Sequence, residues 1–358
     1  METTIALQFQ KLVGVAVERH ASDLHLILGS PPTLRAAGEL LPLDEEKLVT
    51  PEFVQGVVAE LLSPAEQERL NKDRQIVVAR TLGKNFRFKV SIFYQKDGLS
   101  VSLRSIPSQV PPLRELGLPK KFIELTAAKK GLVVITGPFD GGKSTTAVAF
   151  LEAINREQGR YIMTIEEPVE YLFTSAESVI EQREVGRDVL SFAAALQLVK
   201  QEDVEVVYVS QIPDQLTLRN VLEVTESGRL VVIVTSSVGS VRALEELIHL
   251  YPERERDLVR SLLAEHLLGV LHQRLLPRTG SSERVLVPEL LLPSPAVRAV
   301  LREGNLSQLI NLLQTSAAEG MISFDRALSD FVRSGTIALT TALREAQDPE
   351  AFTRLSGR

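Results

Sequence analysis

The sequence predicts an α/β protein with two domains, and three observations lead to this prediction. Short segments of alternating apolar and polar residues recur up to residue 105, and a proline-rich stretch follows them. Apolar runs then alternate with helical segments, which is typical of a parallel sheet that helices cover on both faces. With 358 residues, the chain is long enough to build two separate hydrophobic cores.

The first part of the chain, residues 1–105, is expected to be a small α+β domain. Apolar residues at helical spacing predict one helix over residues 5–20 and a second near residues 51–71. Strands are expected at 24–28, 33–41, 75–81, 86–94 and 99–105, with a hairpin turn at 95–98. Residues 106–119 contain four prolines and one glycine, so they are predicted to be a linker.

The second domain is expected to span residues 120–358. Apolar runs rich in β-branched residues at 132–136, 161–165, 204–210 and 230–235 predict buried parallel strands. From about residue 241 onward the pattern is mostly helical, with 285–292 as a candidate late strand.

Composition and charge exclude several classes of function. The net charge of −6 gives no general attraction to nucleic acid, whose binding proteins usually carry a basic excess. The absence of cysteine excludes disulfides, zinc–thiolate sites and cysteine nucleophiles. The five histidines, His272 among them, show no metal-ligand spacing and are expected to be ordinary surface or core residues.

The location of the protein is expected to be cytoplasmic. No apolar stretch approaches the ~18 residues that a transmembrane helix needs. The first residues also lack the basic segment and apolar run of a signal peptide. Any role at a membrane is therefore expected to depend on partners.

A phosphate-binding motif is the strongest signal in the sequence. Residues 137–144 match G-x-x-x-x-G-K-[ST] at every fixed position, directly after an apolar strand and before a helical segment. The N–H groups of such a loop bind phosphate oxygens, Lys143 adds a positive charge, and Ser144 is expected to ligate magnesium. The residues predicted to contact a nucleotide are Gly137, Pro138, Phe139, Asp140, Gly141, Gly142, Lys143, Ser144 and Thr145.

Asp140 is an unusual residue inside this loop. A carboxylate about 5 Å from a phosphate charge costs roughly 3 kcal/mol at an effective dielectric constant of about 20. Aspartate tolerates left-handed backbone better than most residues, and its side chain can instead point outward. Gly141 and Gly142 keep a close approach of backbone to phosphate possible. We expect weakened binding rather than none.

Glu166 and Glu167 follow the predicted strand 161–165. Acidic residues at the carboxyl end of a strand in an α/β sheet lie in the ligand crevice. There, Glu166 is a candidate to orient a water molecule or to hold magnesium. A pair of glutamates is on its own more often a solvated turn, but its position near the phosphate-binding motif favours a function.

Several motifs in a fixed order resemble those of the secretion ATPase superfamily, and within it the twitching-motility retraction ATPases of type IV pili (PilT- and PilU-like proteins). The resemblance extends from about residue 21 to residue 337. Glu167 stands where the family's aspartate box has an aspartate, and the last motif is similar to an element associated with retraction. The motifs are residues 21–26 (ASDLHL), 164–168 (TIEEP), 182–186 (QREVG), 190–192 (LSF) and 296–304 (AVRAVLREG).

This resemblance implies a PAS-like N-terminal domain, a RecA-like ATPase domain with C-terminal helices, and a homo-hexamer that binds ATP or ADP with Mg²⁺ at subunit interfaces. It also places arginines of the N-terminal domain against the nucleotide phosphates, and Arg87 and Arg104 fall at such positions. Lys89 stands where a further arginine is usual, and lysine cannot reproduce the bidentate fork. Catalytic roles are expected for Glu166, Arg87 and Arg104. Gln211 occupies the position of the catalytic Walker B glutamate and is expected to be a degenerate form of it.

Several positions around the nucleotide depart from the family's pattern. The Walker B strand, residues 206–209, is followed by Ser210 and Gln211 instead of Gly-Glu. Glutamine cannot accept a proton as a base, and loss of a general base typically costs ~10²–10⁴ in rate. Ser236 occupies the position of the family's conserved histidine. The arginines expected around Walker B are replaced by Gln197, Gln201 and Pro213.

Three functions remain open from the sequence. The first is a hexameric ATPase that powers pilus retraction. The second is a nucleotide-binding paralogue with slow or absent hydrolysis, which docks on the inner-membrane platform protein of the pilus or on an active retraction ATPase. The third, a DNA-translocating motor, is opposed by the acidic balance. The departures above favour the second, although Glu166 as the true base would preserve turnover.

Overall fold

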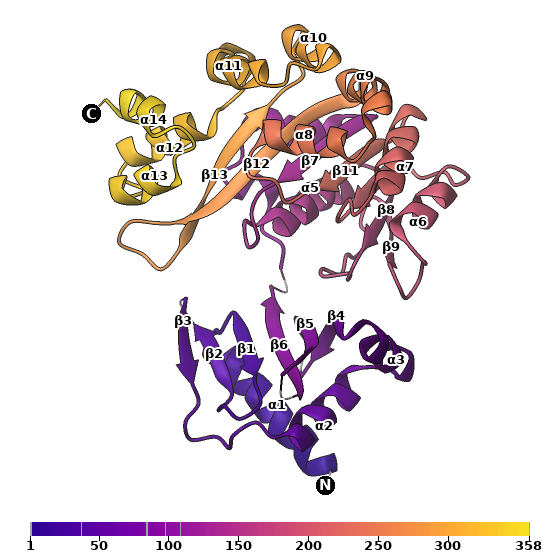
Figure 1. Cartoon of the computed structure of the whole chain (residues 1–358), viewed down its shortest axis with the longest axis vertical. Helices are drawn as coiled ribbons and strands as arrows, with labels where there is room; N and C mark the ends of the chain where they lie inside the picture. Colours follow the sequence, from indigo (N-terminus) through magenta and orange to yellow (C-terminus); the bar gives the residue numbers. More distant parts are fainter. Residues whose placement is uncertain (1, 37, 84, 97, 108, 358) are drawn as a thin grey trace. The chain divides into compact units, whose positions relative to one another are not determined.

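The computed structural model describes residues 2–36, 38–83, 85–96, 98–107 and 109–357, apart from the side chains of residues 2–4. Asp97 of the expected hairpin turn and Ser108 of the expected linker lie outside this description. The chain divides into two compact units (Figure 1). Unit 1 comprises residues 1–109 and 167–172, and unit 2 comprises residues 110–166 and 173–358.

Unit 1 contains a six-stranded antiparallel sheet in the order β3-β2-β1-β6-β5-β4. The expected strand at 33–41 is in fact a hairpin of two short strands, because Gly38 takes a φ of 88° between them. The elements are α1 (Glu2–Glu18), β1 (Asp23–Leu26), β2 (Thr33–Ala36), β3 (Glu39–Pro42), α2 (Pro51–Leu61), α3 (Pro64–Asp73), β4 (Gln75–Leu82), β5 (Phe86–Gln95) and β6 (Gly98–Ile106).

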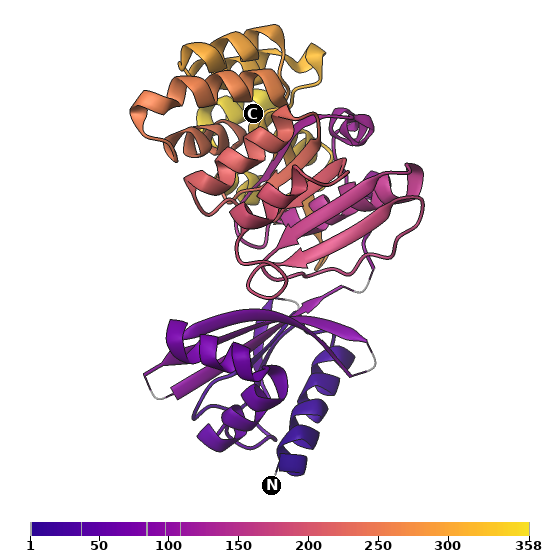
Figure 2. The ribbon, with the colours of Figure 1, turned by 90° about the vertical axis from the view of Figure 1, so that its right-hand side faces the viewer.

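The helices of unit 1 cover one face of its sheet. Helices α1 and α2 lie side by side under the curved sheet (Figure 2). They bury apolar residues such as Leu12 and Val57 against strand residues such as Leu24, Val90 and Leu103. This face is the hydrophobic core of unit 1, whereas the other face carries charged residues such as Lys89 together with the exposed apolar residues Val77 and Phe93.

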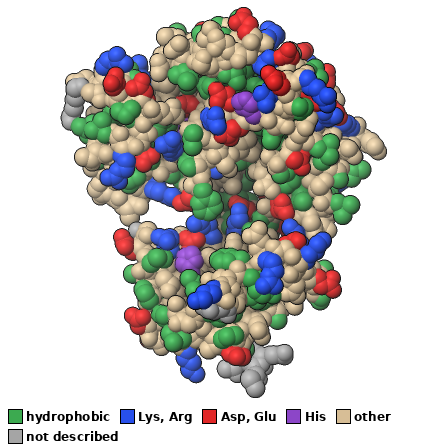
Figure 3. Space-filling model, viewed as in Figure 1, with side chains coloured by type: hydrophobic (Ala, Val, Ile, Leu, Met, Phe, Trp, Pro, Cys, Tyr) green, Lys and Arg blue, Asp and Glu red, His purple; other side chains and the backbone are tan. Residues whose placement is uncertain are grey.

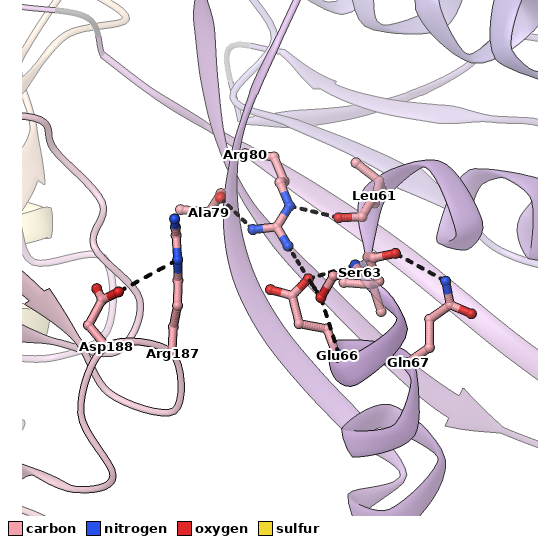
Figure 4. A network of polar contacts seen from close by, with 9 residues as sticks. Leu61, Ser63, Glu66, Gln67, Ala79, Arg80, Arg187 and Asp188 are labelled. Carbon is pink, nitrogen blue, oxygen red and sulfur yellow. Dashed lines mark hydrogen bonds and ion pairs between the residues drawn. The ribbon is translucent and has the colours of Figure 1, made fainter.

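The helix expected near residues 51–71 is two helices, and a polar network marks the break (Figure 4). The Ser63 hydroxyl accepts from the Glu66 N–H, and the Glu66 carboxylate accepts from the Ser63 N–H at 2.8 Å, so the two form a capping box. Arg80 of β4 donates to the same carboxylate (2.5 Å) and to the carbonyl of Leu61 (2.7 Å). Pro64 at the first position of α3 excludes a continuous helix.

Unit 2 contains a seven-stranded sheet in the order β13-β12-β7-β11-β10-β8-β9, parallel except for the β12–β13 pair. Its elements are η1 (Leu113–Glu115), α4 (Lys120–Ile123), η2 (Glu124–Ala127), β7 (Gly131–Thr136), α5 (Lys143–Glu157), β8 (Tyr161–Glu166), β9 (Val179–Glu184), α6 (Phe192–Val199), β10 (Val206–Val209), α7 (Gln215–Glu226), β11 (Leu230–Val234), α8 (Ser240–His249), η3 (Glu253–Glu255), α9 (Arg256–His266), β12 (Leu267–Pro277), β13 (Arg284–Leu291), α10 (Pro295–Glu303), α11 (Gln308–Thr315), η4 (Ala317–Glu319), α12 (Phe324–Arg333), α13 (Leu339–Glu345) and α14 (Pro349–Ser356).

Both faces of the unit 2 sheet are buried, as the apolar runs predicted. Successive residues of a strand point to opposite faces. Along β7, Leu132 and Val134 pack with the helices α6 to α9, whereas Val133 and Ile135 pack with α5 (Figure 1). All four expected strands are present, and the predicted α/β fold class with a parallel sheet is confirmed.

Strand β12 is the main element that the sequence pattern did not predict. Its segment lies in the stretch from about residue 241 onward, which was expected to be mostly helical. In the structure the segment is a strand between β7 and β13, with an irregularity between Leu267 and Gly269. Pairing with two neighbouring strands outweighs the local helix propensity of this leucine-rich segment, because tertiary context overrides intrinsic propensity.

Surface charges of both signs are interspersed over the face drawn in Figure 3. Within the ranges that the structure describes, no helix is both long and apolar enough to cross a membrane. The same residues contain no cluster of three or more His, Asp or Glu side chains arranged to hold a metal ion.

The last three helices form a separate small cluster against β12 and β13. Phe324, Leu328 and Phe352 are buried there with Val287 of β13. The Asp325 carboxylate accepts from the backbone N–H groups of residues 347 and 348, both at 2.8 Å, so the start of α14 is tied to α12. The C-terminal helices are therefore an integral part of unit 2.

Replacing Phe352 by alanine is expected to destabilise unit 2 by about 3–5 kcal/mol, because the side chain is fully buried and leaves a cavity. Urea unfolding followed by circular dichroism measures this loss. The neighbouring Thr353 is exposed, so Thr353→Ala should stay within about 0.5 kcal/mol of the unaltered chain. Equal losses in the two variants would contradict the packing described for α14.

Candidate functional site

The carboxyl ends of four parallel strands meet at one edge of the unit 2 sheet. β7 ends at Thr136, β11 at Val234, β10 at Val209 and β8 at Glu166, and the strand registers bring these ends side by side. The phosphate-binding motif, Glu166 and Gln211 all lie at or just after these ends. The fold of unit 2 therefore brings the predicted nucleotide-binding and water-orienting residues to one edge.

The phosphate-binding loop, residues 137–142, turns the chain from β7 into α5. Asp140 takes a left-handed φ of 61° and Gly142, at the N-cap of α5, a φ of 79°. A Cβ at Gly137 would lie 2.3 Å from the carbonyl oxygen of Gln273, so only glycine fits there. This backbone points the loop and the first turn of α5 toward the same space, as phosphate binding requires.

Three side chains of this loop and helix supply polar groups. The Lys143 ammonium donates to the carbonyl oxygen of Pro138 at 2.7 Å, so it lies over its own loop. Ser144 and Thr145 follow in the first turn of α5, partly exposed. This donor set fits a nucleotide with its magnesium ion, since Lys143 would bind a phosphate oxygen and Ser144 would ligate the metal. Phe139 is 80% exposed at the tip of the loop.

Gln273 of β12 packs against the phosphate-binding loop and hydrogen-bonds to it, a role that the sequence did not indicate. Its side chain is fully buried, and its amide donates to the carbonyl oxygen of Gly141 at 2.7 Å. The Gln273 backbone also fills the space beside Gly137. Because β12 was expected to be helical, no pattern in the sequence placed Gln273 under the loop.

Asp140, whose charge was expected to weaken phosphate binding, forms an ion pair with a residue distant in the sequence. Its carboxylate lies 2.6 Å from the Nη1 atom of Arg284, the first residue of β13. Both side chains are about half exposed. The left-handed φ agrees with the expectation that aspartate tolerates this backbone, whereas the ion pair was not foreseen.

Glu166 is buried at the end of β8, with 3% of its surface exposed. Its Oε1 accepts from the Thr164 hydroxyl at 2.7 Å and from the Gln182 amide at 3.3 Å. Two donors from two strands thus orient the carboxylate, which is the arrangement expected of a group that acts on a water molecule or a metal-bound water. Its catalytic role stays a prediction.

Two of the positions that depart from the family's pattern follow strands that end at this edge. Gln211 follows β10, and Ser236 follows β11, both with exposed side chains. The next residue, Ser237, is buried, and its N–H donates to the Thr136 hydroxyl of β7 at 3.0 Å. The loop that carries Ser236 is therefore fixed beside the strand that leads into the phosphate-binding loop. Exposed side chains also occupy the other altered positions, Gln197, Gln201 and Pro213.

The two arginines predicted to be catalytic belong to unit 1 and have partners there. Arg87 donates to the backbone carbonyls of Val169 and Glu170, both at 2.5 Å. Arg104 donates to the Asp23 carboxylate at 2.9 Å. The strand register sets Lys89 opposite Arg104, so the three cations share one face of the sheet, the face away from α1 and α2. Their action on a nucleotide stays a prediction.

His272 lies in β12 beside the site and is fully buried, in contact with the ring of Phe324. Burial lowers its pKa to about 3, and the positive charges of Arg274 and Lys143 contribute to the lowering. The imidazole is therefore neutral at physiological pH. The sequence had indicated no special environment for this histidine.

A nucleotide-binding α/β domain, joined to a smaller α+β unit, is the class of protein that this fold and site define. The family model described as "Type II/IV secretion system protein" matches residues 2–328, so the chain belongs to this family. The resemblance drawn from the sequence motifs is thereby confirmed.

The chain is also similar to individual proteins of pilus machinery along almost its whole length. It is 31% identical over 351 residues to the type IV pilus retraction ATPase PilT of Pseudomonas aeruginosa, covering 97% of this chain and 100% of that protein. It is 30% identical over 343 residues to the type IV pilus ATPase PilU of the same organism, covering 95% and 89%. The crystal structure of the pilus retraction motor PilT with bound ADP matches with a TM-score of 0.86 and 34% identity, covering 96% and 98%.

Replacing His272 by leucine is expected to reduce the loss of stability in acid. The unfolded state takes up a proton near pH 6.5, whereas the folded state does so only near pH 3, so stability falls as pH decreases through this window. The histidine accounts for up to roughly 3 kcal/mol of that loss between pH 6.5 and about 4. Urea unfolding at several pH values measures it, with exposed His249→Leu as the control. An unchanged pH dependence in His272→Leu would contradict the buried neutral imidazole.

Proposed function

We propose that this protein is a nucleotide-binding member of the type IV pilus machinery that binds ATP or ADP with Mg²⁺ and hydrolyses ATP slowly or not at all. The observation that carries the proposal is a contrast within one site. The loop that would hold the phosphates keeps its glycines, Lys143 and Ser144, whereas Gln211 stands where the family has the glutamate after the Walker B strand. The bound ADP in the similar PilT crystal structure supports a nucleotide at this position.

The reduced hydrolysis follows from the chemistry of the altered positions. Gln211 can hydrogen-bond a water molecule but cannot take its proton. Ser236 has a single hydroxyl and lacks the two ring nitrogens through which a histidine contacts groups on both sides. These two changes remove a proton-accepting group and an imidazole from the residues that follow β10 and β11, at the edge of the sheet that carries the phosphate-binding loop.

The proposed assembly and location follow from the family. We propose a homo-hexamer in the cytoplasm, peripheral to the inner membrane through the pilus platform protein or through an active retraction ATPase. The likeness to PilT and PilU, and the 33% identity over 321 residues to a twitching motility protein of Neisseria gonorrhoeae, support a place in twitching motility. Arg87 and Arg104 would then act on nucleotide phosphates, as the family's pattern implies.

A second candidate function, a fully active retraction motor, is favoured by one observation. Glu166 is buried and oriented by Thr164 and Gln182 at the end of β8, close to the strand that precedes Gln211. If Glu166 is the group that accepts the proton, the glutamine at 211 does not stop turnover.

Replacing Lys143 by alanine is expected to weaken Mg-ADP binding by about tenfold to a hundredfold, since one charge-assisted hydrogen bond to phosphate is lost. Isothermal titration calorimetry measures the affinity. Lys130 is exposed and directly precedes the first residue of β7, at the end of the strand away from the phosphate-binding loop. Lys130→Ala is therefore the matched control and should bind Mg-ADP with unchanged affinity. Unchanged affinity in Lys143→Ala would show that the loop does not hold the nucleotide.

Restoring the family's residues is expected to increase ATP hydrolysis. The double change Gln211→Glu and Ser236→His should raise the rate of phosphate release by about 10² or more, because it supplies a general base and its orienting partner. The control adds Glu166→Gln to the double change and shows whether Glu166 is also required. High phosphate release by the unaltered chain, equal to that of the double variant, would refute the impaired enzyme and support the active motor.

A further inference from the structure

We propose that Arg284 is a positioning residue of the nucleotide site, which neutralises Asp140 so that the phosphate-binding loop still accepts a nucleotide. This inference rests on the proposed nucleotide binding. It adds a residue far away in the sequence, outside the motif, and gives a reason why an acidic side chain is tolerated in the loop.

The contact is placed by the β12–β13 hairpin. Arg284 begins β13 and is paired with Pro277, the last residue of β12. On the same hairpin, Gln273 holds the carbonyl of Gly141 and Arg284 holds the carboxylate of Asp140. The hairpin therefore contacts the loop at two adjacent residues. The buried amide of Gln273 binds Gly141, and the charged guanidinium of Arg284 binds Asp140.

The geometry of the pair favours a role in binding over a role in folding. Both side chains are about half exposed, 47% for Arg284 and 49% for Asp140, and ion pairs of this exposure contribute little to stability. The same carboxylate has a larger effect on a nucleotide, because the phosphates bring negative charges into the loop beside it. A guanidinium at 2.6 Å cancels that repulsion before the phosphates arrive.

Charge neutralisation predicts coupling between the two residues. Without Arg284, the Asp140 carboxylate loses the guanidinium that lies 2.6 Å from it and repels the phosphates more strongly, so binding weakens. Without Asp140, there is no negative charge to compensate, so the loss of Arg284 matters little. Glycine is the suitable replacement for Asp140, since the left-handed backbone at φ 61° accommodates it without strain.

The test is a double-mutant cycle on Mg-ADP affinity, measured by calorimetry on the full chain. Arg284→Ala should weaken binding at least about tenfold in the unaltered background and less than about threefold in the Asp140→Gly background. Arg284→Lys keeps the charge and should restore most of the affinity. Added salt should reduce the effect of Arg284→Ala, because it screens the repulsion.

Two controls separate the failure of this inference from that of the proposed function. Arg278 lies on the same hairpin but pairs with Glu283, so Arg278→Ala should leave the affinity unchanged. Equal losses for Arg284→Ala in both backgrounds, or no loss in the unaltered one, would overturn the inference while binding itself stands. If Lys143→Ala binds as tightly as the unaltered chain, the nucleotide site itself is overturned.

Discussion

The structure of the site depends on the close contact between the phosphate-binding loop and strand β12. Gly137 has no room for a side chain, because the carbonyl oxygen of Gln273 would lie 2.3 Å from its Cβ. The Gln273 amide holds the Gly141 carbonyl from the same strand. Since backbone and a buried side chain make these contacts, the loop keeps its shape even where the motif's variable positions carry Phe139 and Asp140.

Binding and chemistry are separated in this site by the strands that supply them. The groups that would hold phosphate come from the loop after β7 and its support on β12. The groups that would perform chemistry lie at the end of β8 and after β10 and β11, where Glu166 is kept but Gln211 and Ser236 are altered. Substitutions after β10 and β11 can therefore lower turnover without disturbing the packing that shapes the loop.

Much of this arrangement was predictable from the sequence, because short-range patterns determine it. The strand, loop and helix around Lys143 follow from the motif and its apolar neighbours. The position of Glu166 follows from its place after a buried strand. The role of Gln273 was not predictable, since β12 lies in the stretch that was expected to be mostly helical and its strand form depends on pairing with β7 and β13. Arg284 borders the expected strand 285–292, but its contact with Asp140 depends on the β12–β13 hairpin. The compensation of Asp140 was missed for the same reason.

The most direct test of the proposal that the site binds ATP but hardly hydrolyses it is the chemical identity of the nucleotide that remains on the protein. Protein in molar excess is mixed with radiolabelled ATP and Mg²⁺, and samples of the reaction are quenched after increasing times. The labelled ATP and ADP in each sample are then separated and counted. Persistence of bound ATP over many minutes is the predicted result. Rapid conversion of the bound ATP to ADP and phosphate within seconds would contradict the account.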